Sequence, residues 1–469
     1  LLADSPGVTL FLGANDYGIK KGIEYVGADN LEPGDVILMN YPYWSSRHPQ
    51  DVCIFSPLFY EGEIIGYPVV RAHWVDLGQR DAGYLLDATN VHQEGLLLPG
   101  VKIHKAGDPD EELLDVIRFN SRSPTKIIGD LNAQISAVKT GKQRLRSLFE
   151  KYGKDTVEAG IRRINDHGER KAREATRELP NGTWTGVDYL DSDGINDELV
   201  RMEAEVTISD DEFTIDLSGS SDAVEGPFNV PIGLTQSFCK LCFKSITTPN
   251  EPSNGGQYES LSVVAPEGSL FNATYPTPTY AITTAVAAIE VVFKALAEEI
   301  PDRIPASTGG ELGNVAMYGT DPESGETFVQ ASNSGVGWGA TTERDGDNAM
   351  MHYSESTVRN VPIEIWEAQT PVRVNLLELR EDSGGAGTHR GGLGIRTDYE
   401  ATDDSLVAKT FNIKTKTEGW GINGGAPGAR NAVVLYPDES DESHTERFDV
   451  LVDNDELYPD REGRGTGLF

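Results

Sequence analysis

The stretch DVILMNYPYWSSRHPQDVCIFSPLFYEGEIIGYPVVRAH, residues 35–73, contains three apolar runs separated by polar segments. The runs DVILMN, VCIFSPLFY and EIIGYPVVRAH are rich in β-branched and aromatic residues, a composition that predicts strands. Glu61-Gly62 supplies a turn between the second and third runs. The N-terminal part of the chain is therefore expected to be β-rich, with polar groups in the loops where sheets usually present functional side chains.

Two helical patterns follow these strands. Residues 130–153 place apolar side chains on one broad face and end at Gly153, a helix stop signal. Residues 155–179 form a second helical pattern, rich in Arg, Glu and Ala, that the turn sequence PNG terminates. Because only a short break separates the two patterns, they predict a helical hairpin.

Strand-like runs return after residue 199, and helices are expected over residues 234–246 and 279–299. The rest is mostly β with many glycine turns, and no repeat of fixed period occurs. The predicted class is α+β. We expect a β-rich region over residues 1–128, a helical hairpin over residues 129–182, and a mixed core with a β-rich C-terminal part over residues 183–469.

The charge of the chain excludes several classes of partner. Its 40 basic and 75 acidic residues give a net charge of −35 over 469 residues. A field of this sign repels nucleic acid and anionic membranes. The acidic residues are spread along the whole length, which predicts a halophilic protein in a high-salt cytoplasm; the alternative is an ordinary acidic protein.

Cysteine usage and hydropathy indicate an intracellular protein. Cys53, Cys239 and Cys242 are too few for a disulfide framework, which fits a reducing cytoplasm. Cys239-Lys-Leu-Cys242 is a single CxxC in an apolar segment with helical spacing, so we interpret both cysteines as core packing. No apolar run is long enough to span a membrane, and no signal peptide opens the chain.

Two copies of a small pattern predict a metal site. They are His48-Pro-Gln-Asp51 and His73-Trp-Val-Asp76, and His92 lies close behind them in a chain with 8 histidines. Histidine and aspartate three residues apart can face one ion across a turn, and imidazole with carboxylate suits zinc, manganese or iron(II). The alternative is that these histidines cap turns or fill polar pockets.

Other motifs do not support a nucleotide site or an ordinary serine hydrolase. No GxxxxGK[ST] loop, no GxGxxG at a strand-to-helix junction and no G-x-S-x-G elbow occurs, so the glycine-rich segments are interpreted as turns and bulges. Two aromatic segments, Tyr41-Pro-Tyr43-Trp44 and the surroundings of Trp338, could line a pocket or simply pack.

Blocks along nearly the whole chain resemble the hydantoinase B/oxoprolinase family. NYPYWSSRHPQD corresponds to the family's N-D-P-Y-x-G-G-T-H-x-x-D, RAHWVDLG to R-A-H-x-x-D-x-G, and HQEGLLLPGVKI to the Q-E-G-L-x-x-P-x-x-K block. The resemblance continues through DLSGSSDAVEGPFNVP, LREDSGGAGTHRGGLGIR and WGINGGAPG. Blocks of this length in this order are specific to the family.

The resemblance implies an enzyme of two cooperating subunits. The family includes ATP-dependent enzymes that open hydantoins, oxoproline or caprolactam, and relatives that carboxylate acetone or acetophenone. An actin-like ATPase partner, of the hydantoinase A type, phosphorylates the substrate, and the B-type protein completes the reaction at a divalent metal. ATP is thus used by the partner, which explains why this sequence carries no ATP motif.

When the family's motifs are matched to this sequence, the resemblance implies that His48, Asp51 and His73 are metal ligands. It places Gln93 and Glu94 in the third block. In the family an aspartate of a further N-terminal stretch can join the metal, and we expect the fourth ligand from there. Zinc is the expected ion, with manganese or iron as alternatives.

Two further acidic residues are expected to be catalytic. Asp76 or Glu94 would hold the attacking water or orient a ligand histidine, and Asp76 could instead be a direct ligand. Tyr41 and Ser45-Ser46 replace the family's Asp and Gly-Gly in the first block, so the loop beside the metal differs in size and polarity.

We therefore expect the metal-bearing catalytic subunit of an ATP-dependent cyclic amidohydrolase. The first alternative is the catalytic subunit of an ATP-dependent ketone carboxylase, which keeps the metal and changes the reaction. The second is a non-catalytic assembly subunit whose site has decayed; retention of His48, Asp51 and His73 argues against it.

Overall fold

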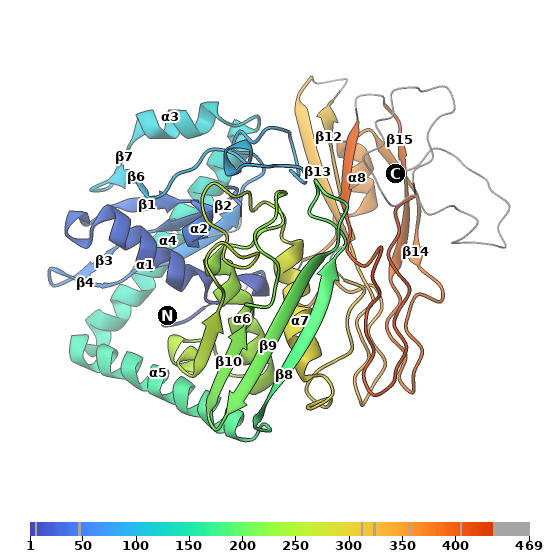
Figure 1. Ribbon diagram of the computed structural model, residues 1–469. Coiled ribbons are helices and arrows are strands. Elements are labelled where there is room, and N and C mark those ends of the chain that lie inside the picture. The colour runs from blue at the N-terminus through green and yellow to red at the C-terminus, as the bar shows by residue number, and fades with distance from the viewer. Residues whose placement is uncertain are drawn as a thin grey trace. The chain divides into compact units, whose positions relative to one another are not determined.

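The computed structural model describes residues 1–4, 7–45, 48–310, 313–321, 325–355, 358–403 and 406–434. These residues combine helices with several β-sheets, which confirms the α+β class (Figure 1). The chain divides into two compact units. Unit 1 comprises residues 1–81, 85–185 and 203–292, and unit 2 comprises residues 82–84, 186–202 and 293 onward. The division at residues 128 and 182 stays a prediction.

A five-stranded antiparallel sheet in unit 1 carries the predicted metal ligands. Its order is β5-β2-β1-β6-β7. The strands are β1 (Val36–Met39), β2 (Asp51–Phe55), β5 (Val69–His73), β6 (Val101–Lys105) and β7 (Asp108–Pro109). A separate hairpin pairs β3 (Leu58–Tyr60) with β4 (Glu63–Gly66). The first predicted run is confirmed as β1.

The second and third predicted runs each divide into two strands at a proline. Pro57 separates β2 from β3, and Pro68 separates β4 from β5. Proline has no N–H to donate to a strand ladder, so it interrupts the pairing that the apolar pattern on its own predicts to be continuous.

The two faces of the five-stranded sheet contribute to two different hydrophobic clusters. On one face Val52, Ile54 and Trp74 pack with residues of α4 (Pro124–Tyr152) and α3 (Glu111–Phe119). On the other face Cys53 and Phe55 pack with residues of α1 (Ala14–Val26). Because side chains alternate along a strand, residues 51 and 53 of β2 share the second face with residues 71 and 73 of β5.

Gln134 ties α4 to the two strands that carry the site. Its buried amide donates to the carbonyl oxygens of Val52, at 2.9 Å, and Val70, at 3.3 Å. Its own oxygen accepts from the Trp74 indole N–H at 2.9 Å. These bonds satisfy polar groups of both β2 and β5 and hold the helix against their shared face.

The predicted helical hairpin is confirmed as α4 and α5 (Lys154–Arg177) (Figure 1). Gly153 joins them with a positive φ of 79° that favours glycine. The helix α4 begins at Pro124, before the predicted residue 130. Proline fits the first turn of a helix, where the missing N–H has no intrahelical partner to lose.

A second sheet has the order β11-β10-β9-β8. Its strands are β8 (Gly182–Leu190), β9 (Val200–Ser209), β10 (Glu212–Asp216) and β11 (Leu261–Val264). The helix α6 (Ile232–Thr247) confirms the helix predicted over residues 234–246, and both of its cysteines are buried in the core, as expected. Shorter elements are η1 (Thr9–Phe11), η2 (Ala28–Asn30), α2 (Pro42–Ser45), η3 (Val91–Gln93) and η4 (Gly255–Tyr258).

The helix predicted over residues 279–299 is α7 (Thr283–Leu296), which begins later than expected. A tertiary contact explains the later start of the helix. The backbone N–H groups of Thr279 and Tyr280 donate to the carboxylate of Glu94, a residue distant in sequence. This tertiary contact engages the segment that the apolar pattern assigns to the first helical turn.

Unit 2 is largely β, as predicted for the C-terminal part. One sheet has the order β13-β12-β16, and β14 pairs with β15. The strands are β12 (Gly313–Thr320), β13 (Thr327–Ser334), β14 (Val372–Leu379), β15 (Ile395–Ala401) and β16 (Val407–Phe411). The helix α8 (Ile363–Gln369), which the sequence analysis did not predict, contributes Trp366 to a small core with Met317 and Tyr399.

Glycines in unit 2 allow one backbone to pack directly on another. A Cβ on Gly337 would lie 1.9 Å from the carbonyl oxygen of Gly392, and one on Gly392 would lie 2.0 Å from that of Asp347. Trp338 bonds to both neighbours: its N–H donates to Asp347 at 3.0 Å and its oxygen accepts from Gly392 at 2.8 Å. These two glycines therefore allow close backbone approach. Gly392 belongs to a glycine-rich segment that the sequence analysis interpreted as turns and bulges.

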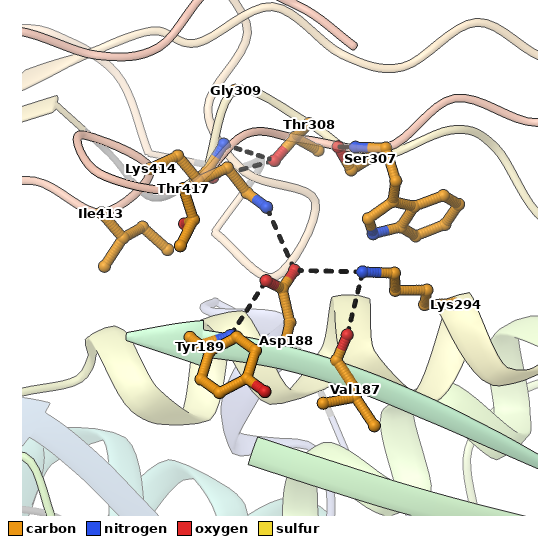
Figure 2. Close-up of polar contacts among 12 residues, drawn as sticks. Val187, Asp188, Tyr189, Lys294, Ser307, Thr308, Gly309, Ile413, Lys414 and Thr417 are labelled. Carbon is orange, nitrogen blue, oxygen red and sulfur yellow. Dashed lines mark hydrogen bonds and ion pairs between the residues drawn. The ribbon is translucent and has the colours of Figure 1, made fainter. Parts of the chain in front are cut away.

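Charged side chains link β8, α7 and the segment after β16 in unit 2. Figure 2 shows Asp188 between Lys414 and Lys294. Its Oδ2 lies 3.5 Å from Lys414 Nζ and 4.0 Å from Lys294 Nζ. Lys294 also donates to the carbonyl oxygen of Val187 at 2.9 Å. Because Asp188 already pairs with two cations, we interpret this cluster as structural and not as a binding site.

Candidate metal centre

The three predicted metal ligands meet at one end of the five-stranded sheet in unit 1. Asp51 is the first residue of β2 and His73 the last residue of β5, and the two are register partners. His48 lies in the turn before β2, where the backbone N–H of Asp51 donates to the carbonyl oxygen of His48 at 3.0 Å. The turn and the strand pairing therefore bring together ligands from two sequence segments.

The carboxylate of Asp51 faces both imidazoles. Its Oδ2 lies 3.0 Å from His48 Nδ1, and its Oδ1 lies 3.2 Å from His73 Nδ1. The two imidazole rings are 4.6 Å apart, with an interplanar angle of 53°. One possible ligand atom from each residue lies within 4.8 Å of the other two. These are the three residues that the family resemblance implies as ligands.

The burial of the three residues is asymmetric. His48 and Asp51 are buried, whereas the side chain of His73 is 46% exposed. Two imidazoles and one carboxylate match the donor set of catalytic zinc sites, which keep a further position for water or substrate. The residues present thus fit a divalent ion with one accessible side.

Neighbouring groups hold the ligand turn in place. The Asn40 amide donates to the carbonyl oxygens of Pro49 and Leu96, both at 2.8 Å. Gln50 donates to the Glu94 carbonyl oxygen at 2.7 Å, and the Tyr280 ring lies 4.9 Å from the His48 ring. Such surrounding contacts fix the orientation of ligand side chains.

Glu94 is buried in unit 1. Its Oε1 accepts the backbone N–H of Thr279 at 2.7 Å and of Tyr280 at 2.9 Å. Among the described residues its Oε2 has no hydrogen-bond partner. Burial raises the pKa of the Glu94 carboxyl well above its ordinary value, against the opposing effect of the Thr279 and Tyr280 N–H groups. The neighbouring Gln93 caps a turn by accepting the Thr89 N–H.

Asp76 is held by Arg122. Its Oδ1 lies 2.6 Å from Arg122 Nη1, and its Oδ2 accepts the backbone N–H of Arg122. It does not belong to the group of three that could hold an ion in the described part of the chain. Engagement of both oxygens favours a positioning role over proton transfer; the catalytic role of Asp76 stays a prediction.

The other landmarks of the sequence have local contacts of their own. His92 is exposed, and its Nε2 lies 2.9 Å from the hydroxyl of Tyr275. Tyr41 packs edge-on against Tyr43, with ring centroids 5.2 Å apart. Ser46 lies outside the described residues, and the side chain of Ser45 is likewise outside them. The Trp338 indole donates to the Met351 carbonyl oxygen at 2.6 Å, a packing role.

Two neighbours of the site were missed by the sequence analysis. Tyr280, which contacts His48, comes from a segment expected to be helical. Asp130 of α4 is near His73: burial raises the pKa of its carboxyl, while the charge of His73 acts in the opposite direction. Asp130 lies four residues before Gln134, and this helical spacing toward one face was the available signal.

The chain thus has an α+β fold and a group of three residues that could hold a metal ion of the kind found in catalytic sites. The chain belongs to the hydantoinase B/oxoprolinase family, whose pattern matches residues 1–463. It is 32% identical to a putative B-type component of a D-/L-hydantoinase from Pseudomonas sp. strain NS671, with 91% of this chain and 74% of that protein aligned. It is also 32% identical to the beta component of the caprolactamase of Pseudomonas jessenii, with coverage of 87% and 71%.

Solved structures share the fold. The crystal structure of the ATP-dependent caprolactamase from Pseudomonas jessenii matches with a TM-score of 0.81 and 30% identity, over 92% of this chain and 74% of that chain. A nucleotide-free acetone carboxylase structure matches with a TM-score of 0.83 over 92% of this chain and 60% of that chain. Its 20% identity supports a common fold only. No described helix is both long and apolar enough to cross a membrane.

Proposed function

We propose that this chain is the metal-bearing catalytic subunit of an ATP-dependent enzyme that hydrolyses a cyclic amide of the hydantoin, lactam or oxoproline type. The observation that carries the proposal is the convergence of His48, Asp51 and His73 with one side accessible. Relatives named for components of a hydantoinase and a caprolactamase, each 32% identical, support the reaction class.

The residues of the centre have distinct roles in this proposal. His48, Asp51 and His73 hold the ion, which when bound supplies a water of lowered pKa and polarises the acyl centre. Glu94, whose carboxyl has a pKa raised by burial, exchanges a proton near the site through its Oε2. Asp76 fixes the segment after His73 through Arg122.

The partner in this proposal is an actin-like ATPase of the hydantoinase A type, which activates the substrate with ATP. Support comes from the related proteins that are named as subunits.

The test is a reconstitution of the chain with such an ATPase. Candidate cyclic amides are supplied with ATP, and ring-opened product and ADP are measured. We expect ring opening that needs both proteins and that falls at least 100-fold in Glu94→Gln, a near-isosteric change that removes the titrating proton. Unchanged ring opening in Glu94→Gln would exclude its proton-transfer role.

A second series separates the carboxylase alternative. Acetone or acetophenone replaces the cyclic amide, with and without bicarbonate. Bicarbonate-dependent carboxylated product, with no ring opening of any amide, would replace the hydrolase proposal by the carboxylase. An assembly role is the answer if His73→Ala changes no rate of the reconstituted enzyme.

A further inference from the structure

Arg71 lies beside the candidate metal centre on the same face of the sheet. It pairs with Cys53 in the register of β2 and β5, and the adjacent pair on that face is Asp51 with His73. Two residues along a strand span about 7 Å. The backbone of Arg71 therefore lies next to the candidate centre on this face of the sheet.

The guanidinium of Arg71 is shielded, and among the described residues it forms no ion pair with a carboxylate. All three of its nitrogens are buried; they have no oxygen or nitrogen partner among these residues, and the thiol of Cys53 is the side chain that they hydrogen-bond. Two of its described neighbours are the Phe11 ring, 4.9 Å from the guanidinium carbon, and Cys53, whose side chain is fully buried. Neither side chain is a carboxylate.

A buried guanidinium without an acidic partner is unfavourable, because it has lost water and gained no compensating acceptor. Arg122, in the same unit, differs from Arg71 because it forms an ion pair with Asp76. Guanidinium presents a planar fork of donors that matches carboxylate or phosphate oxygens. The missing partner of Arg71 is therefore best supplied by an oxyanion.

We propose that Arg71 is an oxyanion-binding residue that holds the anionic group of a substrate or reaction intermediate at the metal centre. The anion is a phosphoryl group or a carboxylate, since both offer the fork geometry. This inference rests on the proposed function, because it places the anion on the substrate of that site. It adds a positioning residue that lies two residues before the ligand His73.

The test measures anion binding to the metal-stripped full chain by titration calorimetry at constant ionic strength. Inorganic phosphate and acetate are the two probes. Wild type is compared with Arg71→Met, Arg71→Lys and the control Arg146→Met, whose residue is 57% exposed on α4. We expect saturable binding to wild type and the control, at least tenfold weaker binding to Arg71→Met, and an intermediate affinity for Arg71→Lys.

Thermal unfolding supplies a second readout. In buffer without oxyanions we expect Arg71→Met to unfold at the same or a higher temperature than wild type, because the change removes an uncompensated buried charge. Added phosphate or acetate should raise the midpoint of wild type and leave that of Arg71→Met unchanged. Preference for phosphate indicates a phosphorylated intermediate, and preference for acetate indicates a carboxylate product.

Three results would overturn the inference. The first is that wild type shows no saturable binding of phosphate or acetate. The second is that Arg71→Met binds these anions as tightly as wild type does. The third is that Arg71→Met has a lower midpoint of thermal unfolding than wild type in oxyanion-free buffer, which would show a structural role. Metal content is measured on the same preparations before stripping. A chain that holds metal but no oxyanion contradicts only this inference, whereas one that binds oxyanion through Arg71 but never metal contradicts only the proposed function.

Discussion

Asp51 faces His73 across the β2–β5 pair, with 3.2 Å between the carboxylate Oδ1 and the imidazole Nδ1. The other carboxylate oxygen lies 3.0 Å from Nδ1 of His48. One acidic side chain thus joins two histidines, one from its own turn and one from a neighbouring strand. The centre depends on strand register, because a shift by one residue would turn His73 to the opposite face.

We predict that Asp76 and Arg122 act as one unit. Arg122→Gln should lower the free energy of unfolding by about 3 kcal/mol, because it leaves the buried carboxylate of Asp76 uncompensated. Asp76→Asn should lower it less, because the side chain of Arg122 is partly in contact with solvent. The double variant should lose less than the sum of the two changes. Urea unfolding measures all three, and partner-dependent turnover should fall by the same factor in both single variants.

The exposed pair Arg146–Glu150 on α4 is the matched control, and its loss should change the free energy of unfolding by less than about 0.5 kcal/mol. A far larger loss of turnover in Asp76→Asn than in Arg122→Gln, at equal stability, would assign Asp76 to the reaction itself.

Asp35 gives the stability of the chain a defined pH dependence. Burial raises the pKa of Asp35, but a hydrogen bond from Lys102 and backbone N–H groups of Ala106 and Glu32 outweigh it, so the net pKa lies below 3.8. A lowered folded-state pKa stabilises the protein above the unfolded-state value, and this stability is lost as pH falls through the folded-state value.

Asp35→Asn should therefore lower the free energy of unfolding by about 3 kcal/mol near neutral pH, where the bond to Lys102 at 2.7 Å is charged. The deficit should shrink as pH falls below about 4. Urea unfolding over a pH series measures it, with the exposed Asp115→Asn as control. A deficit that stays constant down to the acid limit would refute the electrostatic origin.

Several elements could be predicted from the sequence because their signals are local. Gly153 ends one helix, and the apolar runs mark β1 and the other strands. The three metal-site residues could be predicted from their spacing and the family resemblance. Pro57 and Pro68 are local signals for the strand breaks, but the apolar pattern across each proline predicts one continuous strand.

Other features depend on tertiary contacts that no local pattern reveals. Glu94 binds the amides of Thr279 and Tyr280, which moves the start of α7 and brings Tyr280 to His48. Asp76 and Arg122 pair although they are 46 positions apart in the sequence, and no motif around either residue predicts this pairing.

The close backbone packing of unit 2 predicts a sharp difference between two glycines. Gly337→Ala should lower the thermal midpoint strongly, or prevent unit 2 from folding, because its Cβ would lie 1.9 Å from a backbone oxygen. Gly394→Ala is the control, since the nearest atom to its Cβ is the Ser383 hydroxyl at 3.9 Å. Thermal unfolding compares the two, and equal midpoints would show that these backbones are not in close contact.

The metal content of the purified chain tests the central claim most directly. Elemental mass spectrometry, in high salt, compares wild type with His48→Ala, His73→Ala and the control His167→Ala, whose residue lies exposed on α5. We predict close to one zinc, manganese or iron per chain in wild type and the control, and at least a tenfold loss in both site variants. Equal metal in His48→Ala, His73→Ala and wild type would contradict the proposed centre.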